Sequence, residues 1–131
     1  MNEPFIFRVR DCYYIRASYP SPAEHRHFAA HPVFALERPF TALVDGKSVE
    51  TVGIAIGSDV PHTILSVDPA LVVFIDELTP MSRCVKHTLL QGASWRTLDA
   101  SVSSRVRERW GKVRTETDVT AAAAETERLL G

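Results

Sequence analysis

Residues 39–57, PFTALVDGKSVETVGIAIG, carry the clearest structural signal in the chain. Two runs rich in apolar residues, 39–44 and 47–57, flank the dipeptide Asp45-Gly46. Such a dipeptide between apolar runs is typical of a β-hairpin, because glycine supplies the positive φ that a two-residue turn requires. We therefore expect two antiparallel strands joined by a tight turn at Asp45-Gly46.

Similar short runs lie on both sides of this hairpin and extend the pattern towards both ends. β-Branched and aromatic residues dominate them, and turn-forming residues separate them, which is typical of β-strands. A series of short strands at near-regular spacing favours a sandwich or barrel. We expect an all-β barrel over about residues 4–77, with these further strands: FIFRVR (5–10), CYYIRAS (12–18), HFAAHPVFALE (27–37), HTILSV (62–67) and ALVVFID (70–76).

After Pro80 the hydrophobic period changes from two to about 3.6, which indicates helices. A final helix is expected over about residues 117–130. We therefore predict helices from about 80 to 130 as a C-terminal appendage to the barrel, all within a single domain of residues 1–131. Five apolar residues, spaced three or four apart, form one predicted helical stripe: Trp95, Leu98, Val102, Val106 and Trp110.

The composition favours a soluble globular protein and gives no electrostatic reason to expect nucleic acid or membrane as partner. The chain has 131 residues, of which 45% are hydrophobic and 24% are charged, and its formal net charge is −1. No apolar run approaches the roughly 18 to 20 residues that span a bilayer, and charges interrupt the N-terminus too often for a signal peptide. We expect a cytoplasmic protein in which Cys12 and Cys84 are buried free thiols.

The basic residues of the predicted helical region surround its apolar stripe. Because acidic residues are interleaved with them, the solvated face of a helix is favoured over a nucleic-acid patch. The residues concerned are Arg105, Arg107, Arg109, Lys112 and Arg114.

Histidines are concentrated in AEHRHFAAH (23–31). In an extended strand, period two places His25, His27 and His31 on one face, and a paired strand could add His62, which follows Pro61. Such a set suits zinc, iron, copper or nickel, and it also suits an organic ligand held by hydrogen bonds in a barrel mouth. Both alternatives stay open, whereas His87 lies beyond the change of period on a predicted helix and is excluded.

No independent catalytic constellation accompanies the histidines. A nucleophile-elbow motif is missing from the sequence. Tyr13, Tyr14 and Asp76 could contribute acid-base groups, and the sequence assigns none of them a role. A catalytic function would therefore depend on a bound metal.

The order of these features resembles the two motifs of the cupin superfamily: HxH on one strand, a hairpin at Asp45-Gly46, and a lone histidine after Pro61. The resemblance implies a double-stranded β-helix, which is a small jelly-roll barrel. Metal-binding cupins draw two histidines and a glutamate from the first motif and a third histidine from the second. Carried over, His25 and His27 match the pair, His31 occupies the glutamate position, and His62 matches the second motif.

Three longer segments, HRHFAAHPVFALERPFTALVDG, GIAIGSDVPHTI and LVVFIDELTPMSRCVKHTLLQG, are similar to the N-terminal sensor domain of AraC-type transcriptional regulators. This resemblance implies a non-catalytic domain that binds a small-molecule effector, forms a homodimer and acts in regulation. The helix-turn-helix domain of a complete regulator is not found in these residues, so an independent cupin and one module of a longer protein are both open.

The predicted function is thus small-molecule binding by a cupin domain of the AraC sensor kind, with His25, His27, His31 and His62 lining the pocket. The alternative is a divalent-metal-dependent cupin enzyme, a dioxygenase or an isomerase, that uses the same four histidines as ligands.

Overall fold

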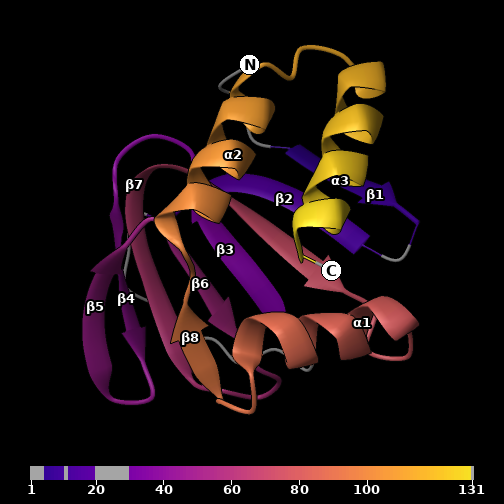
Figure 1. The fold of residues 1–131 in the computed structure, drawn as a ribbon. Helices are drawn as coiled ribbons and strands as arrows, with labels where there is room; N and C mark the ends of the chain where they lie inside the picture. Colours follow the sequence, from indigo (N-terminus) through magenta and orange to yellow (C-terminus); the bar gives the residue numbers. More distant parts are fainter. Residues whose placement is uncertain (1–4, 11, 20–29, 131) are drawn as a thin grey trace.

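The computed structural model describes residues 5–10, 12–19 and 30–130, which form antiparallel strands with helices packed along one side (Figure 1). A π-helical segment, η1, directly continues α1. The strands are β1 (Phe5–Val9), β2 (Cys12–Tyr19), β3 (His31–Ala35), β4 (Phe40–Val44), β5 (Lys47–Thr51), β6 (Gly53–Ile56), β7 (His62–Ile75) and β8 (Trp95–Thr97), and the helical segments are α1 (Pro80–Val85), η1 (Lys86–Leu90), α2 (Ala100–Gly111) and α3 (Glu116–Leu130).

β7 connects the two sheets of the fold. Its first residues, from His62 to Leu65, pair with β4, whereas residues 70–75 pair with β2 and residues 70–72 also pair with β3. The larger sheet has the order β1-β2-β7-β3-β6-β8, and the β4–β5 hairpin joins it only through β7. Buried side chains of β4 share one apolar cluster with those of β3 and β6, so the two sheets face each other across a barrel interior.

The hairpin predicted from Asp45-Gly46 is present between β4 and β5. Asp45 has φ 49° and Gly46 has φ 80°, and Val44 pairs with Lys47 across the turn. Positive φ at both central residues is the requirement of the two-residue turn that matches the twist of paired strands. The turn residues therefore set the register of the whole hairpin.

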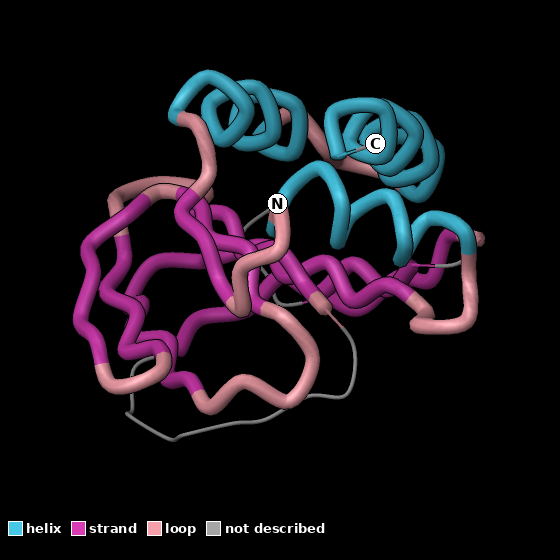
Figure 2. Tube along the Cα trace, turned by 60° about the horizontal axis from the view of Figure 1, so that its bottom comes forward, coloured by secondary structure: helices cyan, strands magenta, loops and turns pink. Residues whose placement is uncertain are grey.

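Side-chain alternation gives the larger sheet two buried faces. On β7, Leu71 and Val73 belong to the cluster beneath the helices, whereas Ala70 and Val72 belong to the barrel interior. A strand buried on both faces reads as a continuous apolar run, as residues 70–75 do. The helices lie together over one face of this sheet (Figure 2), and their cluster includes Val85, Val106, Trp110, Val119 and Leu130.

The barrel followed by a helical appendage is the predicted fold class, but three details of the prediction were wrong. Residues 47–57 form two strands instead of one, and residues 62–75 form one strand instead of two. Two residues assigned to the helical stripe lie outside the helices: Trp95 is on β8, which pairs with β6, and Leu98 lies between β8 and α2. Their spacing from Val102 matched a helical period by coincidence, because β8 pairs with β6 and Trp95 packs against the barrel cluster.

The cysteines differ from the prediction in one respect. Cys12 is a buried free thiol, as expected, but Cys84 is exposed on α1. The helix turns this position away from the sheet, towards which its neighbour Val85 points.

Within the described part of the chain, no helix combines the length and apolar character needed to cross a membrane.

Candidate functional site

Two of the four predicted histidines lie side by side in the barrel. His31 begins β3 and His62 begins β7, and their side chains are only 2% and 4% exposed. His31 has the same strand parity as Val33, and His62 the same parity as Ile64, both of which belong to the barrel cluster. The ring centroids of the two histidines are 5.0 Å apart. The structure therefore brings His31 and His62 together on the inner face of the barrel.

The other two predicted site residues, His25 and His27, lie outside the described residues, so the convergence of all four histidines stays a prediction. Among residues 5–10, 12–19 and 30–130, no three His, Cys, Asp or Glu side chains form a group that could hold a metal ion. His87, which the sequence excluded from the site, is exposed on η1.

A backbone carbonyl orients the His62 ring. Nδ1 of His62 lies 2.9 Å from the carbonyl oxygen of Val60. Because a carbonyl only accepts hydrogen bonds, we infer that Nδ1 carries a proton; in the neutral form of the ring, Nε2 is then the acceptor nitrogen. This arrangement is common in histidines that bind metals, and it equally directs an acceptor towards a donor group of an organic ligand.

Phe74 adds an aromatic wall to the histidine pair. Its ring centroid lies 4.9 Å from that of His31, with the planes tilted by 38°. The barrel cluster is apolar and mainly aliphatic, and it includes Val60 and Ile64. Among the described residues, two imidazoles beside this apolar cluster resemble the few convergent polar groups that orient a ligand in a pocket.

Glu77, which sequence reasoning missed, joins three segments near the pair. Its Oε1 accepts hydrogen bonds from the Ala30 amide, at 2.9 Å, and from Ser58 Oγ, at 2.5 Å. Its Oε2 accepts one from Lys86 Nζ at 2.6 Å. Burial raises the pKa of Glu77, but the hydrogen bonds from Lys86, Ser58 and Ala30 outweigh this effect and hold that pKa below its usual range.

A surface hollow of about 290 Å³ lies beside this network, lined by residues that include Ser58, Val60, Lys86 and Leu90. It shares Ser58 and Lys86 with the Glu77 network. It also includes Val60, whose carbonyl orients the His62 ring. The hollow is near the lower limit of size for a small-molecule pocket.

The remaining acid-base residues that the sequence singled out lie elsewhere. Tyr14 is fully buried on the helix-covered face of the sheet, and this burial raises its pKa. Tyr13 is 44% exposed, with the Arg8 guanidinium carbon 5.5 Å from its ring centroid. Asp76 accepts a hydrogen bond from the Leu78 amide in the turn after β7. None of the three joins the histidine pair.

Comparisons with known proteins bear on the fold. No protein-family model matches the chain, and no curated protein matches it. Among solved structures, protein NMB1881 from Neisseria meningitidis has a TM-score of 0.51 and 16% identity, covering 56% of this chain and 84% of its own. A cupin protein from Bacteroides fragilis has a TM-score of 0.48 and 13% identity, with 60% and 80% covered.

A cupin-2 domain containing protein from Shewanella frigidimarina has a TM-score of 0.46 and 11% identity, covering 56% of this chain and 78% of its own. At such identities a likeness concerns the fold alone. The strand order, the pairing of β7 in both sheets and the helices of the C-terminal part give this chain the architecture predicted for it, an antiparallel cupin-type β-barrel with a helical C-terminal appendage.

Proposed function

We propose that the chain is a small-molecule-binding module whose ligand contacts His31 and His62 inside the barrel. The observation that carries this proposal is the burial of two imidazoles, 5.0 Å apart, among apolar side chains. Apolar residues would fill a purely structural core without the desolvation cost of two imidazoles. The two rings, from β3 and β7, provide directed polar contacts for an organic ligand.

The AraC resemblance suggests how such a module would be used. In this proposal it is a non-catalytic, cytoplasmic sensor domain that binds an effector and acts in transcription regulation, with His25 and His27 providing further contacts. Self-association as a homodimer belongs to the same proposal, since symmetric dimers are the commonest oligomers. Sedimentation at micromolar concentration should give a dimer, and a monomer alone would contradict this part.

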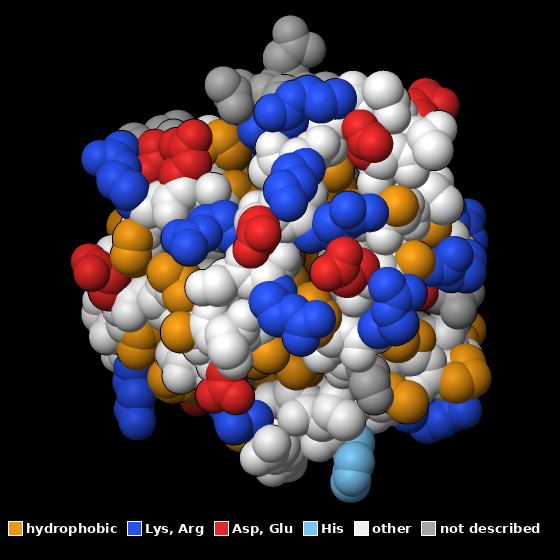
Figure 3. All heavy atoms as spheres, turned by 45° about the horizontal axis from the view of Figure 1, so that its top comes forward, with side chains coloured by type: hydrophobic (Ala, Val, Ile, Leu, Met, Phe, Trp, Pro, Cys, Tyr) orange, Lys and Arg blue, Asp and Glu red, His pale blue; other side chains and the backbone are white. Residues whose placement is uncertain are grey.

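Direct nucleic-acid binding is not part of the proposal. Basic and acidic side chains are interspersed over the face shown in Figure 3. On the helices, Arg109 pairs with Glu125 at 3.2 Å and Lys112 with Glu108 at 3.6 Å. Such pairing reduces the positive charge that phosphate binding requires.

One observation favours a second candidate, a divalent-metal-dependent dioxygenase or isomerase. The His62 Nδ1 atom lies 2.9 Å from the Val60 carbonyl oxygen, the kind of contact that orients histidine ligands of metals through their other ring nitrogen. His31 is the neighbouring imidazole, and His25 and His27 would complete the set. Zinc, iron, nickel or copper would supply Lewis acidity or oxygen activation there.

Metal content and ligand binding together test the proposal. Protein purified without a histidine tag should contain substoichiometric metal, unchanged by His27→Ala or His62→Ala. A thermal-shift screen of small organic molecules should identify compounds that raise Tm, since a ligand of the native state stabilises it by mass action. His62→Ala should abolish that rise, and His87→Ala, which changes an exposed histidine, should preserve it.

Near one equivalent of a transition metal, lost on His27→Ala and His62→Ala, would replace the first proposal by the second. Compounds that raise the Tm of wild type and of His62→Ala equally would contradict the proposed pocket at His31 and His62.

A further inference from the structure

The three partners of Glu77 come from the segments that hold the histidine pair and from the helical layer, which consists of α1, η1, α2 and α3. Ala30 immediately precedes His31 at the start of β3, and Ser58 lies in the turn between β6 and β7, four residues before His62. Lys86 begins η1, whose Leu89 and Leu90 are buried in the cluster beneath the helices. One carboxylate therefore contacts the strand of one histidine, the turn before the other, and the helical layer.

These contacts are of the kind that fixes geometry. Hydrogen bonds to an ionised carboxylate are shorter and about twice as strong as bonds between neutral groups. The Glu77 side chain is 28% exposed, so solvent competes with its bonds only in part. Removing the carboxylate would leave the Ala30 amide without this acceptor, and it would separate the turn at Ser58 from η1.

We propose that Glu77 is a positioning residue that couples the helical layer to the histidine pair. A displacement of η1 that withdraws Lys86 would release the carboxylate, and the starts of β3 and β7 would lose a shared anchor. Because coupling between two sites is reciprocal, a ligand that shifts His31 or His62 would in turn shift the helical layer. This signalling role rests on the proposed function, whereas the coupling itself is testable without a ligand.

The test uses NMR of the full chain with matched substitutions. Glu77→Gln retains an oxygen acceptor but loses the charge, and Lys86→Met removes only the ion pair with η1. Lys112→Met is the control, because it also removes a lysine-glutamate ion pair from the helical layer, on α2, without contacting Glu77. The readouts are the ring nitrogen shifts of His31 and His62, which report the tautomer, and the exchange rate of the Ala30 amide.

We expect Lys86→Met to shift the ring signals of both histidines, and Lys112→Met to leave them at their wild-type positions. Glu77→Gln should also change the tautomer populations of His62 and accelerate exchange of the Ala30 amide about fivefold or more, which corresponds to one weakened hydrogen bond.

Identical histidine signals in Lys86→Met and Lys112→Met would overturn the coupling. So would wild-type histidine signals and Ala30 exchange in Glu77→Gln. If Glu77→Gln does not fold, the comparison of the two lysine variants decides alone, because Lys86 is half-exposed and its replacement leaves the other contacts of Glu77 in place. Failure to find any ligand would weaken the proposed function and leave these results unaffected.

Discussion

At the residue scale, the absence of a side chain at Gly53 allows α2 to pack directly on β6. A Cβ at this position would lie 2.1 Å from Ser103 Oγ and 3.3 Å from Ser103 Cβ. Ser103 is only 2% exposed and cannot rotate away into solvent. The Gly53 carbonyl also accepts a hydrogen bond from the Leu98 amide at 2.9 Å, which positions the chain just before α2.

Gly53→Ala should therefore lower the free energy of unfolding by about 1–3 kcal/mol, the usual cost of overpacking a filled core. Ser103→Ala removes the hydroxyl that collides with the new methyl group, so the cost of Gly53→Ala should fall in that background. Urea denaturation of the four proteins of this cycle measures the difference. Gly111→Ala is the control, because nothing lies within 4 Å of its added Cβ. Equal costs in both backgrounds would show that the contact is not responsible.

The residues of the candidate site could be predicted only where a local pattern specifies them. Strand period two predicted an inward-facing position for His31, and the cupin resemblance predicted that His62 would lie beside it. In the structure His31 pairs with β6 and His62 with β4, so the two rings meet across the barrel interior. Glu77 could not be found in this way, because Ala30, Ser58 and Lys86 come from three segments far apart in sequence. Only the three-dimensional fold brings these donors to one carboxylate.

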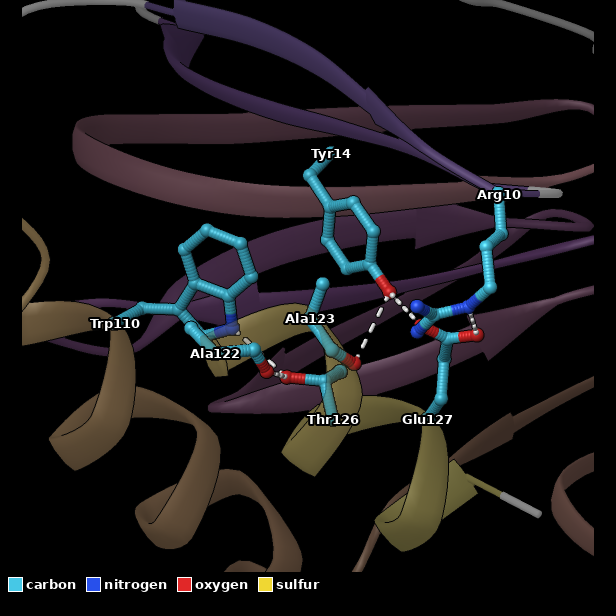
Figure 4. Close-up of polar contacts among 7 residues, drawn as sticks. All are labelled: Arg10, Tyr14, Trp110, Ala122, Ala123, Thr126 and Glu127. Atoms are coloured by element: carbon cyan, nitrogen blue, oxygen red, sulfur yellow. Dashed lines mark hydrogen bonds and ion pairs between the residues drawn. The ribbon is translucent and has the colours of Figure 1, made fainter. Parts of the chain in front are cut away.

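At the scale of elements, polar contacts attach α3 to α2 and to β2 (Figure 4). Thr126 Oγ1 accepts a hydrogen bond from Trp110 Nε1 and donates one to the Ala122 carbonyl, both at 2.8 Å. The Tyr14 hydroxyl lies 3.4 Å from the Ala123 carbonyl, and the Tyr14 ring stacks on Trp110 with centroids 5.1 Å apart. These contacts orient α3 on α2 and on the sheet.

Thr126→Val should lower the free energy of unfolding by about 1–3 kcal/mol, because it leaves the buried indole N–H of Trp110 without its acceptor while side-chain volume is kept. Thr120→Val provides the control on the same helix, since the Thr120 hydroxyl bonds the carbonyl four residues earlier from an exposed position. That change should stay within about 0.5 kcal/mol of wild type. Chemical denaturation distinguishes the two, and equal effects would contradict a specific role for the Trp110 contact.

Elements were predictable where local sequence dominates and were missed where packing decides. The hairpin at Asp45-Gly46 and a helix over residues 116–130 follow from turn chemistry and from hydrophobic period. β8 has only three residues, too few for a period to be recognised, and it is a strand because β6 offers a free edge beside it. The continuity of β7 through Asp68-Pro69 likewise depends on its partners on both sides, which turn propensity does not reveal.

At the scale of the whole molecule, the two apolar clusters lie on opposite faces of the same strands. β2, β3, β6 and β7 contribute residues to the cluster beneath the helices and to the barrel interior. Loss of either cluster exposes one face of the shared sheet. The clusters should therefore unfold together as one cooperative unit.

The two tryptophans allow this cooperativity to be measured, because each lies in a different cluster. Trp110 is 1% exposed beneath the helices, and Trp95 packs against the barrel cluster. Trp110→Phe leaves Trp95 as reporter of the barrel, and Trp95→Phe leaves Trp110 as reporter of the helical layer. In each variant, the fluorescence midpoint in urea should coincide with the midpoint of far-ultraviolet ellipticity.

Trp110→Phe should have the lower midpoint of the two, because it also removes the donor to Thr126, yet its transition should remain single. A Trp95 signal that persists after most ellipticity is lost would mean that the barrel survives without the helices. Such a result would place the boundary of cooperative structure between the two clusters, and it would remove the physical basis for signal transfer from the barrel interior to η1.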